Sequence, residues 1–468
     1  MYEPYKIKVV EPLPITTRAQ REQALRAAGY NLFGLRAADV TIDLLTDSGT
    51  AAMSQDQWAA LMRGDESYAG ARSWHRFLDV VTETFGFPHV IPAHQGRAAE
   101  RLLFGALLPT ASGHTVPSNA HFDTTKGNLE VLGVSARDLP CAEAADPAKA
   151  APFKGNIDLD ALRDLLAGSR PVPLVMLTVT NNAAGGQPVS MANIAATAAL
   201  AHEAGVPFYL DACRIAENAY FIQQRESGYE HTSIADIVRH MCSHADGITF
   251  SAKKDGLANI GGFLATRDEQ LAARARQLCV VSEGYPTYGG LAGRDLEAIA
   301  VGLREVLDAD YLRHRIDSTA FLVAELQARG IPMVLPAGGH AAYIDAAAFL
   351  PHLPLLQYPA QALLGEIYLE GGVRGAELGT VTFGLDGTTG HEQPAAWELV
   401  RLALPRRVYT RSHLAYVADT IGAVYQRRHG IRGLRITEQP LVMRNFTARF
   451  APATTSVDTA APKVYQGT

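Results

Sequence analysis

The chain has 468 residues, more than the roughly 250–300 residues that one hydrophobic core usually organises, so two domains are expected. Apolar residues make up 47% and charged residues 19% of the sequence, which is typical of a compact folded protein and excludes a fibrous or disordered chain. The formal net charge of −6 provides no basic surface for nucleic acid or an anionic membrane, so the expected partner is a small molecule.

Cysteine spacing and the first residues indicate the compartment. The four cysteines lie far apart and form no CxxC pair, which argues against a disulfide framework and against a zinc knuckle. The first residues, MYEPYKIKVVEP, contain charge and proline where a signal peptide needs an apolar run, and no stretch of ~18 apolar residues occurs. We therefore expect a cytoplasmic protein.

In chain order, residues 1–45 contain a helical segment, TRAQREQALRAAG, and are expected to form an arm that packs with the later domain. Residues 46–310 then alternate apolar runs with helical patterns: PLVMLTVT, MANIAATAALAHEAG, VPFYLDAC, GITFSAKK and GGFLATR. This alternation predicts βαβ units, and thus an α/β fold with a mostly parallel sheet covered by helices. Ligands of such sheets bind at the carboxyl ends of the strands.

The second half of the chain predicts a different kind of domain. One long helix is expected over residues 293–330, with the domain change near residue 310. Residues 311–450 contain shorter strands, such as PMVLP and AAYIDA, and predict a smaller α+β domain. Residues 451–468 are small, polar and proline-containing, which predicts a disordered tail.

Two predicted strand ends supply the residues best suited to catalysis. The run VPFYL leads to Asp211, and ITFSA leads to Lys253 and Lys254, so these side chains are expected in one crevice. A lysine at the end of a buried strand is suited to a Schiff base, and a carboxylate can keep a pyridine nitrogen protonated. The alternative is that Asp211 caps the next helix and that both lysines are solvated.

The segment PAHQGRAAERLLF contains a possible anion site. It places Gln95, Gly96 and Arg97 at the start of an amphipathic helix, where free backbone N–H groups favour an anion such as a phosphate. Ser251, just before the lysine pair, could add a hydroxyl group to the same phosphate. An ordinary helix start explains the same tripeptide equally well.

Nine further short segments follow one another along the chain in this order: IDLLTDSGT, HQGR, AGGQPVS, ENAYFI, KKD, PTYGG, GGHAA, YPAQA and FTARF. Together they resemble the β-eliminating lyases, the family of tryptophan indole-lyase and tyrosine phenol-lyase, from about residue 5 to residue 450. The resemblance implies a pyridoxal 5'-phosphate (PLP) enzyme with the fold of aspartate aminotransferase (fold type I). It also implies a homotetramer built from two catalytic dimers.

Matched by position, the resemblance implies a role for each site residue. The cofactor contacts would be Lys254 as the Schiff-base lysine, Asp211 at the pyridine nitrogen, Phe122 stacked on the ring, Asn182 and Arg214 at the 3-oxygen, and Gln95, Gly96, Arg97 and Ser251 at the phosphate. The substrate contacts would include Arg401 at the carboxylate, Tyr68 as the acid that protonates the leaving group, and Tyr285, Tyr288 and Phe446. Tyr68 and Tyr288 would reach the site from the neighbouring subunit.

A monovalent-cation site is implied in the same way. Glu66 and the backbone carbonyls of Gly49 and Asn259 match the family's cation ligands, and the family prefers potassium. Oxygen ligands alone suit a hard cation.

The pocket for the aromatic ring departs from both branches of the family. Asp123 and Leu378 stand where the phenol-lyase branch has a threonine and an arginine, and both changes are toward the indole-lyase branch. Asn445 stands where the indole-lyase branch has histidine and the phenol-lyase branch phenylalanine, and Ala376 is smaller than its counterpart in either. A carboxylate at Asp123 would accept a hydrogen bond from an indole N–H and repel a phenolate. Alternatively, Asp123 caps the turn DTTKG.

These residues predict β-elimination of an aromatic L-amino acid to the free arene, pyruvate and ammonia, with tryptophan or a ring-substituted relative favoured. The first alternative is a tyrosine phenol-lyase-type enzyme acting on tyrosine or a modified tyrosine. Transamination and C–S lysis by the same cofactor stay open. A catalytically inactive homologue is disfavoured because folding does not require Lys254, Asp211, Arg97, Arg401 and Tyr68 together.

Overall fold

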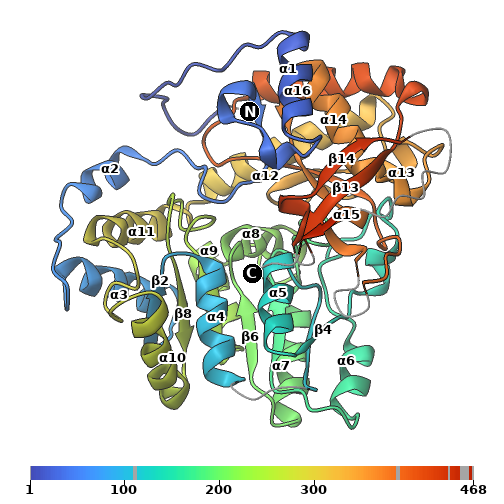
Figure 1. The fold of residues 1–468 in the computed structure, drawn as a ribbon. Helices are drawn as coiled ribbons and strands as arrows, with labels where there is room; N and C mark the ends of the chain where they lie inside the picture. The colour runs from blue at the N-terminus through green and yellow to red at the C-terminus, as the bar shows by residue number, and fades with distance from the viewer. Residues whose placement is uncertain (1, 109–112, 386–389, 441–442, 454–462, 466–468) are drawn as a thin grey trace. The chain divides into compact units, whose positions relative to one another are not determined.

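The computed structural model describes residues 2–108, 113–385, 390–440, 443–453 and 463–465. The chain divides into two compact units, each built from more than one segment (Figure 1). Unit 1 contains Met1–Thr46, Asp317–Pro405 and Tyr409–Thr468, and unit 2 contains Asp47–Ile316 and Arg406–Val408. The N-terminal arm thus belongs to the same unit as most of the C-terminal third of the chain.

Unit 2 is organised around a five-stranded sheet in the order β2-β8-β7-β6-β5. The strands are β2 (His89–Ala93), β8 (Gly262–Thr266), β7 (Gly247–Ser251), β6 (Phe208–Asp211) and β5 (Val175–Thr178). The β5, β6 and β7 strands pair in parallel, whereas β8 runs antiparallel to both β7 and β2. The strands expected from the apolar runs are therefore confirmed, with β8 as the reversed strand.

Helices cover both faces of this sheet. Neighbouring residues of a strand point to opposite faces, so each buried strand contributes apolar side chains to both helix layers. In β5, Met176 packs in the core formed by α4 (Gly96–Leu107) and α10 (Glu269–Ser282). Val175 and Leu177 pack in the larger core on the other side. That core is formed by α3 (Arg72–Phe85), α7 (Met191–Glu203), α8 (Ile215–Arg225), α9 (Ile234–Ser243) and α11 (Gly293–Glu305). Figure 1 shows α4 in front of the sheet, between β8 and β6.

The remaining elements of unit 2 lie outside the main sheet. They are the helices α2 (Gln55–Leu61), α5 (Asp123–Val131) and α6 (Leu159–Leu166), and the parallel strand pair β3 (Thr115–Ser118) and β4 (Ser135–Asp138). The α5 helix packs against α4. This contact places the segment around Asp123 beside the helix that begins at Gly96.

Unit 1 has its own core and three small sheets. Its strands are β9 (Ala341–Asp345), β11 (Ala376–Leu378) and β12 (Leu399–Ala403), which are antiparallel, β1 (Ile42–Asp43) with β10 (Val373–Arg374), and β13 (Leu434–Pro440), β14 (Arg449–Pro452) and β15 (Lys463–Tyr465). Its helices are α1 (Arg18–Ala27), α13 (Ala346–Phe349), α14 (Pro359–Gly371), α15 (Thr380–Phe383) and α16 (Arg411–Gln426). The arm helix α1 packs against α14.

The expected single helix over 293–330 is wrong, because the structure has two. The α11 helix ends at Glu305, and α12 (Ala309–Ala328) begins after a break at Asp308. The Asp308 carboxylate accepts a hydrogen bond from the Tyr311 N–H at 2.7 Å, which satisfies a free donor of the first turn of α12 and starts a new helix. The α12 helix begins in unit 2 and ends in unit 1.

The expected disordered tail, residues 451–468, needs a partial correction. Residues 454–462 and 466–468 lie outside the described residues. Lys463–Tyr465 forms β15, which pairs in parallel with β13, and β14 extends to Pro452. A polar segment can join a sheet edge because the ladder uses only backbone groups. Within the described residues, no helix has the length and apolar character needed to span a bilayer.

Candidate active site

The carboxyl ends of three parallel strands bring sequence-predicted residues to one edge of the unit 2 sheet. Asp211 is the last residue of β6 and Ser251 the last of β7, and the register pairs Asp211 with Thr178 and with Thr249. Lys254 follows in the turn after β7, where its N–H donates to the Ser251 carbonyl at 3.1 Å. The edge therefore presents a buried carboxylate and a lysine.

Cys213 lies beside both of these charged groups, although sequence analysis did not single it out. Its N–H donates to the Asp211 Oδ1 atom at 3.2 Å. Burial raises the pKa of the Cys213 thiol well above its ordinary value; the Asp211 charge adds to this rise, and the Lys254 charge opposes it. The thiol therefore lies within electrostatic reach of Asp211 and Lys254, which places the two groups in one neighbourhood.

The start of α4 forms a close backbone contact with the end of β7. A Cβ atom built on Gly96 would lie 2.7 Å from the Ser251 Cβ atom, and one on Gly262 would lie 2.7 Å from the Gln95 carbonyl carbon. Glycine is thus required at both positions. The first N–H groups of α4 have no acceptor within the helix, so this contact brings free donors next to the Ser251 hydroxyl.

Positive charge gathers at the same place. Burial lowers the pKa of Lys253, and the neighbouring charges of Lys254 and Arg97 lower it further. The Arg97 side chain, in the first turn of α4, is exposed. Three cations and a helix start with free N–H groups can hold a doubly charged anion such as a phosphate ester.

A buried ion network lies directly behind the lysine turn. The Arg214 guanidinium donates to both carboxylate oxygens of Asp47, at 2.9 and 2.7 Å. Arg406 donates to Asp47, Glu217 and Asp255, each at 2.9 Å, and its side chain is fully buried. Of these residues only Arg214 was predicted from sequence to have a site role; Asp47, Glu217 and Asp255 lie in segments of the family pattern, and Arg406 lies in none of them.

Asp255 connects this network to the turn that contains the candidate lysine. Burial raises its pKa to about 6, and the Arg406 charge opposes this rise. Its second oxygen accepts from the Ala216 N–H at 2.9 Å, at the start of α8. The residue after Lys254 is therefore fixed to two other elements of unit 2, which restricts the movement of the turn.

The remaining predicted cofactor and ring residues of unit 2 lie on turns near these strands. Asn182 is buried in the turn after β5. Phe122 immediately precedes α5, and Asp123 is the first residue of that helix. The Asp123 Oδ1 atom accepts from the N–H of the next residue, Thr124, at 2.6 Å, but Phe122 and not Asp123 is the N-cap residue of α5.

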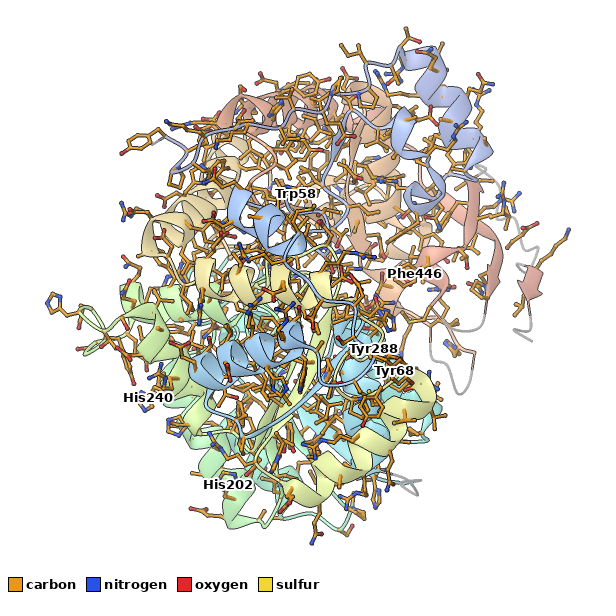
Figure 2. The ribbon with its side chains drawn as sticks, turned by 90° about the vertical axis from the view of Figure 1, so that its left-hand side faces the viewer. Trp58, Tyr68, His202, His240, Tyr288 and Phe446 are labelled. Carbon is orange, nitrogen blue, oxygen red and sulfur yellow. The ribbon has the colours of Figure 1, made fainter. Side chains whose placement is uncertain are left out.

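Tyr68 lies in a cluster of tyrosines within its own chain. Its ring centroid is 5.4 Å from that of Tyr288 and 5.7 Å from that of Tyr285, as Figure 2 shows for Tyr68 and Tyr288. The hydrogen bond with Tyr288 raises the pKa of Tyr68 above its ordinary value. Tyr68 is 70% exposed, which leaves its ring available at the molecular surface.

The three predicted cation ligands are only partly brought together. The Asn259 side-chain amide donates to the Gly49 carbonyl at 3.0 Å, so these two residues are neighbours. Glu66 instead forms an ion pair with Arg294 at 2.9 Å on the surface. Among the described residues, no group of three or more His, Cys, Asp or Glu side chains could hold a metal ion.

Three of the predicted substrate residues of unit 1 share one sheet. Arg401 on β12 is the register partner of Ala376 on β11, and Leu378 pairs with Leu399 two positions along, so Arg401, Ala376 and Leu378 lie on the same face. Arg401 also donates to the Leu45 carbonyl at 3.2 Å. The β11–β12 ladder therefore brings together three residues that are far apart in sequence.

Asn445 and Phe446 occupy a short 3-10 turn in the same unit. The Asn445 carbonyl accepts from the Asn31 side chain at 3.2 Å. The Phe446 ring lies 4.8 Å, centroid to centroid, from Phe33, a residue that sequence analysis did not single out. Both contacts tie the turn to the N-terminal arm. Figure 2 shows the Phe446 ring.

Comparison with known proteins gives one family and two named activities. The model of the family described as Beta-eliminating lyase matches residues 43–420. A tryptophanase of Hyphomonas neptunium is 56% identical over 452 residues, covering 96% of this chain and 98% of that protein. A tyrosine phenol-lyase of Intrasporangium calvum is 54% identical, covering 96% of this chain and 95% of that protein. Overall identity therefore does not separate the two activities.

Solved structures with low sequence identity share the fold. The serine palmitoyltransferase of Sphingomonas wittichii aligns with a TM-score of 0.59 at 14% identity, covering 88% of this chain and 97% of that one. A threonine aldolase of Leishmania major also aligns with a TM-score of 0.59 at 14% identity, covering 82% and 99%. These likenesses confirm the predicted α/β fold class.

Proposed function

The chain belongs to the beta-eliminating lyase family, and on that premise we propose that it is a PLP-dependent lyase that splits an aromatic L-amino acid between Cβ and the ring. Overall, the amino acid and one water yield the free arene, pyruvate and ammonia. The observation that supports this proposal most strongly is the joint presence of Asp211, Ser251 and Lys254 at the carboxyl edge of β6 and β7.

The residues of unit 2 fit the cofactor. A phosphate suits the free N–H groups at Gly96 and Arg97, the Ser251 hydroxyl and the Gln95 backbone, because the close contact of Gly96 with Ser251 leaves no side chain in between. Asp211 supplies a carboxylate for the pyridine nitrogen, Phe122 a ring to stack on it, and Asn182 and Arg214 donors for its 3-oxygen. When bound, PLP supplies an electron sink for the charge that develops at Cα.

The chain's own residues would bind the substrate and move its protons. Lys254 would hold the cofactor covalently and then accept the proton from Cα, and Arg401 would bind the substrate carboxylate through a bidentate pair. Tyr68 would donate a proton to the ring carbon that leaves, a general-acid step worth ~10²–10⁴-fold in rate. Tyr285, Tyr288 and Phe446 would contact the substrate.

We propose tryptophan or a ring-substituted tryptophan as the substrate. Leu378 removes the cation that would pair with a phenolate, and Asp123 supplies an acceptor for a ring N–H. Ala376 and Asn445 leave space for a substituent. The alternative, supported by the identity to a tyrosine phenol-lyase, is tyrosine or a modified tyrosine.

A direct assay tests this proposal. The purified protein, loaded with PLP in potassium buffer, would be incubated separately with tryptophan, tyrosine and S-methyl-L-cysteine, and pyruvate would be measured over time. We expect a visible absorption band from the bound cofactor and the most pyruvate per unit time from tryptophan among the two aromatic substrates. Release of pyruvate from S-methyl-L-cysteine alone would contradict a carbon–carbon lyase. No pyruvate from any of the three would contradict the whole proposal.

The assembly and the cation are part of the same proposal. We propose a homotetramer of two catalytic dimers that acts in the cytoplasm and uses potassium at the carbonyls of Gly49 and Asn259 and the Glu66 carboxylate. The ion pair between Glu66 and Arg294 would then open to release the carboxylate. Equal elimination rates in sodium-only and potassium buffers would contradict the proposed potassium site.

A further inference from the structure

A second buried carboxyl group lies close to Asp211, and the roles proposed above do not use it. Glu100 lies on α4, one helical turn after Arg97, and is only 6% exposed although it carries an ionisable group. Lone carboxyl groups are almost never buried without partners, so its partners indicate what it does.

Among the residues that the structure describes, the side-chain partners of the Glu100 carboxyl group come from one helix. The Thr125 hydroxyl donates to its Oε1 atom at 2.5 Å, and the Asn128 amide lies 3.4 Å from its Oε2 atom. The same Asn128 amide donates to the Arg97 carbonyl at 3.2 Å. Thr125 and Asn128 are three residues apart and so face the same way on α5. Glu100 therefore fastens α5 to α4.

The α5 helix, which Glu100 links to α4, starts at two residues of the candidate pocket. Phe122 precedes its first turn and Asp123 starts it, two residues before Thr125. A shift of α5 would move both the ring proposed to stack on the cofactor and the carboxylate proposed to select the substrate. The position of Glu100 thus controls two groups that it does not touch.

The charge of Glu100 also acts on the candidate catalytic groups. Burial raises the pKa of Glu100 to about 7, and the Asp211 charge raises it further, whereas the Thr125 hydrogen bond and the Lys254 charge lower it. Glu100 also contributes to the raised pKa of Cys213. The charges of Asp211, at the end of β6, and of Lys254, in the turn after β7, therefore act on this carboxyl group, which contacts α5 through Thr125.

We propose that Glu100 is a positioning residue that holds the start of α5, and with it Phe122 and Asp123, in register with the cofactor. The inference rests on the proposed PLP-dependent function. It assigns aromatic selectivity in part to a residue that contacts neither the ring of the substrate nor the cofactor.

Four variants of the full-length enzyme test this assignment: Glu100→Gln, Glu100→Ala, Thr125→Val and, as a matched control, Glu130→Gln. Glu130 lies on the exposed side of the same α5 helix, so the control makes the same chemical change without touching the contact. Two quantities would be measured: the visible circular dichroism of bound PLP, and kcat/KM for tryptophan relative to S-methyl-L-cysteine. The second substrate has no ring to be positioned.

We expect Glu100→Ala and Thr125→Val each to change the dichroism band and to lower the tryptophan to S-methyl-L-cysteine ratio by about tenfold or more, since errors near 1 Å can cost ~10²-fold. A fifth variant that combines Glu100→Ala with Thr125→Val should lose little more than the worse single variant, because both substitutions break the same contact. Glu100→Gln, which keeps an acceptor for Thr125, should fall between the parent and Glu100→Ala. The Glu130→Gln control should match the parent.

The outcomes separate this inference from the proposed function. Parent enzyme that eliminates both substrates, with Glu100 and Thr125 variants within about twofold of the parent ratio and an unchanged band, would overturn the positioning role. Parent enzyme that eliminates neither substrate, with a dichroism band that still changes in Glu100→Ala, would overturn the lyase and leave the positioning role standing. If Glu100→Ala fails to fold, Glu100→Gln and Thr125→Val decide the question by the same two measurements.

Discussion

Two adjacent lysines follow β7, and their surroundings differ. The Lys253 carbonyl accepts from the Gly49 N–H at 2.7 Å, and a Cβ atom built on Gly49 would lie 2.6 Å from the Lys253 Cε atom. The Lys253 side chain therefore runs along the loop that contains Gly49. Lys254 is instead the lysine whose charge acts on the half-buried Cys213 beside Asp211.

Replacement of each lysine separately should distinguish them. We expect Lys254→Ala to abolish turnover and the visible band of the Schiff base, because a covalent link to PLP needs its amine. Lys253→Ala should keep the band and lose only part of the activity through weaker phosphate binding. Absorption spectra before and after borohydride reduction provide the measurement. Loss of the band in Lys253→Ala with its retention in Lys254→Ala would move the assignment by one residue.

We expect a single side chain, Asp123, to favour tryptophan over tyrosine. A carboxylate that accepts an indole N–H gains a charge-assisted hydrogen bond of roughly 1.5–3 kcal/mol, and a tyrosine ring offers no such donor. We expect Asp123→Ala to lower kcat/KM for tryptophan by about tenfold to a hundredfold and to leave tyrosine nearly unchanged. Equal losses for both substrates would assign Asp123 to the α5 start, where it already accepts the Thr124 N–H.

Some site residues could be identified from sequence, and others could not. Asp211 and Lys254 follow apolar runs, so their place at a sheet edge follows from the pattern. Glu100 was quoted within PAHQGRAAERLLF but not singled out, although a glutamate on the apolar face of an amphipathic helix was a usable signal. The partner that explains it, Thr125, lies on another helix, and sequence alone does not give that contact.

At the level of elements, the strands were easier to predict than the helix boundaries. The strands β5 to β8 are short apolar runs enclosed on both faces, and such runs stand out in the sequence. The break between α11 and α12 was missed because the apolar pattern continues through Val306 and Leu307. The α11 helix ends at Glu305, and the side-chain hydrogen bond of Asp308 to the Tyr311 N–H starts the next helix.

The contact between α4 and β7 makes a prediction about cofactor binding. Gly96→Ala should weaken PLP binding by about tenfold or more, because the added Cβ atom would meet the Ser251 Cβ atom at 2.7 Å and displace the helix start. Gly105→Ala on the same helix is the matched control, since its new Cβ atom meets only the flexible Leu278 side chain at 3.0 Å. Equilibrium dialysis of PLP against both variants gives the comparison. Equal PLP affinities of the two variants would contradict a phosphate site at the contact between the start of α4 and Ser251.

A pair of buried glutamates around α15 makes stability depend on pH. Glu398 accepts from the Thr380 N–H at 2.9 Å, and Glu377 accepts from the Val381 and Thr382 N–H groups at 3.0 Å. Burial raises the pKa of Glu377 to about 8, and the neighbouring Glu398 charge raises it further. Folded unit 1 therefore keeps a proton that the unfolded chain releases above its ordinary pKa of 4.5.

The sign of the effect follows directly. Stability should fall as pH rises from about 5 to 8, by up to about 1.4 kcal/mol per pH unit, and should level off above that range. Glu398→Gln removes the neighbouring charge and should flatten the dependence, whereas Glu22→Gln on α1 should not. Urea unfolding midpoints at several pH values provide the measurement. A midpoint that rises from pH 5 to 8 in the parent and is unaffected by Glu398→Gln would contradict the raised pKa.

The division of the chain into two units has one feature that the sequence pattern does not predict. Arg406–Val408 belongs to unit 2, although the residues on both sides belong to unit 1. The cause is the burial of Arg406 among Asp47, Glu217 and Asp255, which are far from it in sequence. Removing one member of such a network leaves an uncompensated buried charge. The ion pairs of Arg406 therefore hold this short segment in unit 2.

The assembly of the whole enzyme can be tested by combining two inactive variants. Tyr68 is 70% exposed, and the family resemblance implies that it acts in the site of the neighbouring subunit, whereas Lys254 acts in its own. Tyr68→Phe and Lys254→Ala should each be inactive alone. In a mixed dimer, the Lys254→Ala subunit would donate an intact Tyr68 to the site that retains Lys254, so one of the two sites becomes complete.

Co-expression of the two variants should therefore restore activity. Random pairing gives mixed dimers for half of the molecules, each with one complete site, so we expect about a quarter of the parent activity per subunit. Co-expression of Lys254→Ala with a Tyr68→Phe/Lys254→Ala double variant is the control and should stay inactive, because no subunit retains Lys254. Mixed dimers can be isolated by giving the two variants different affinity tags. If these mixed dimers are inactive, Tyr68 and Lys254 act within the same chain. The exposed tyrosine cluster would then have no role across the subunit interface.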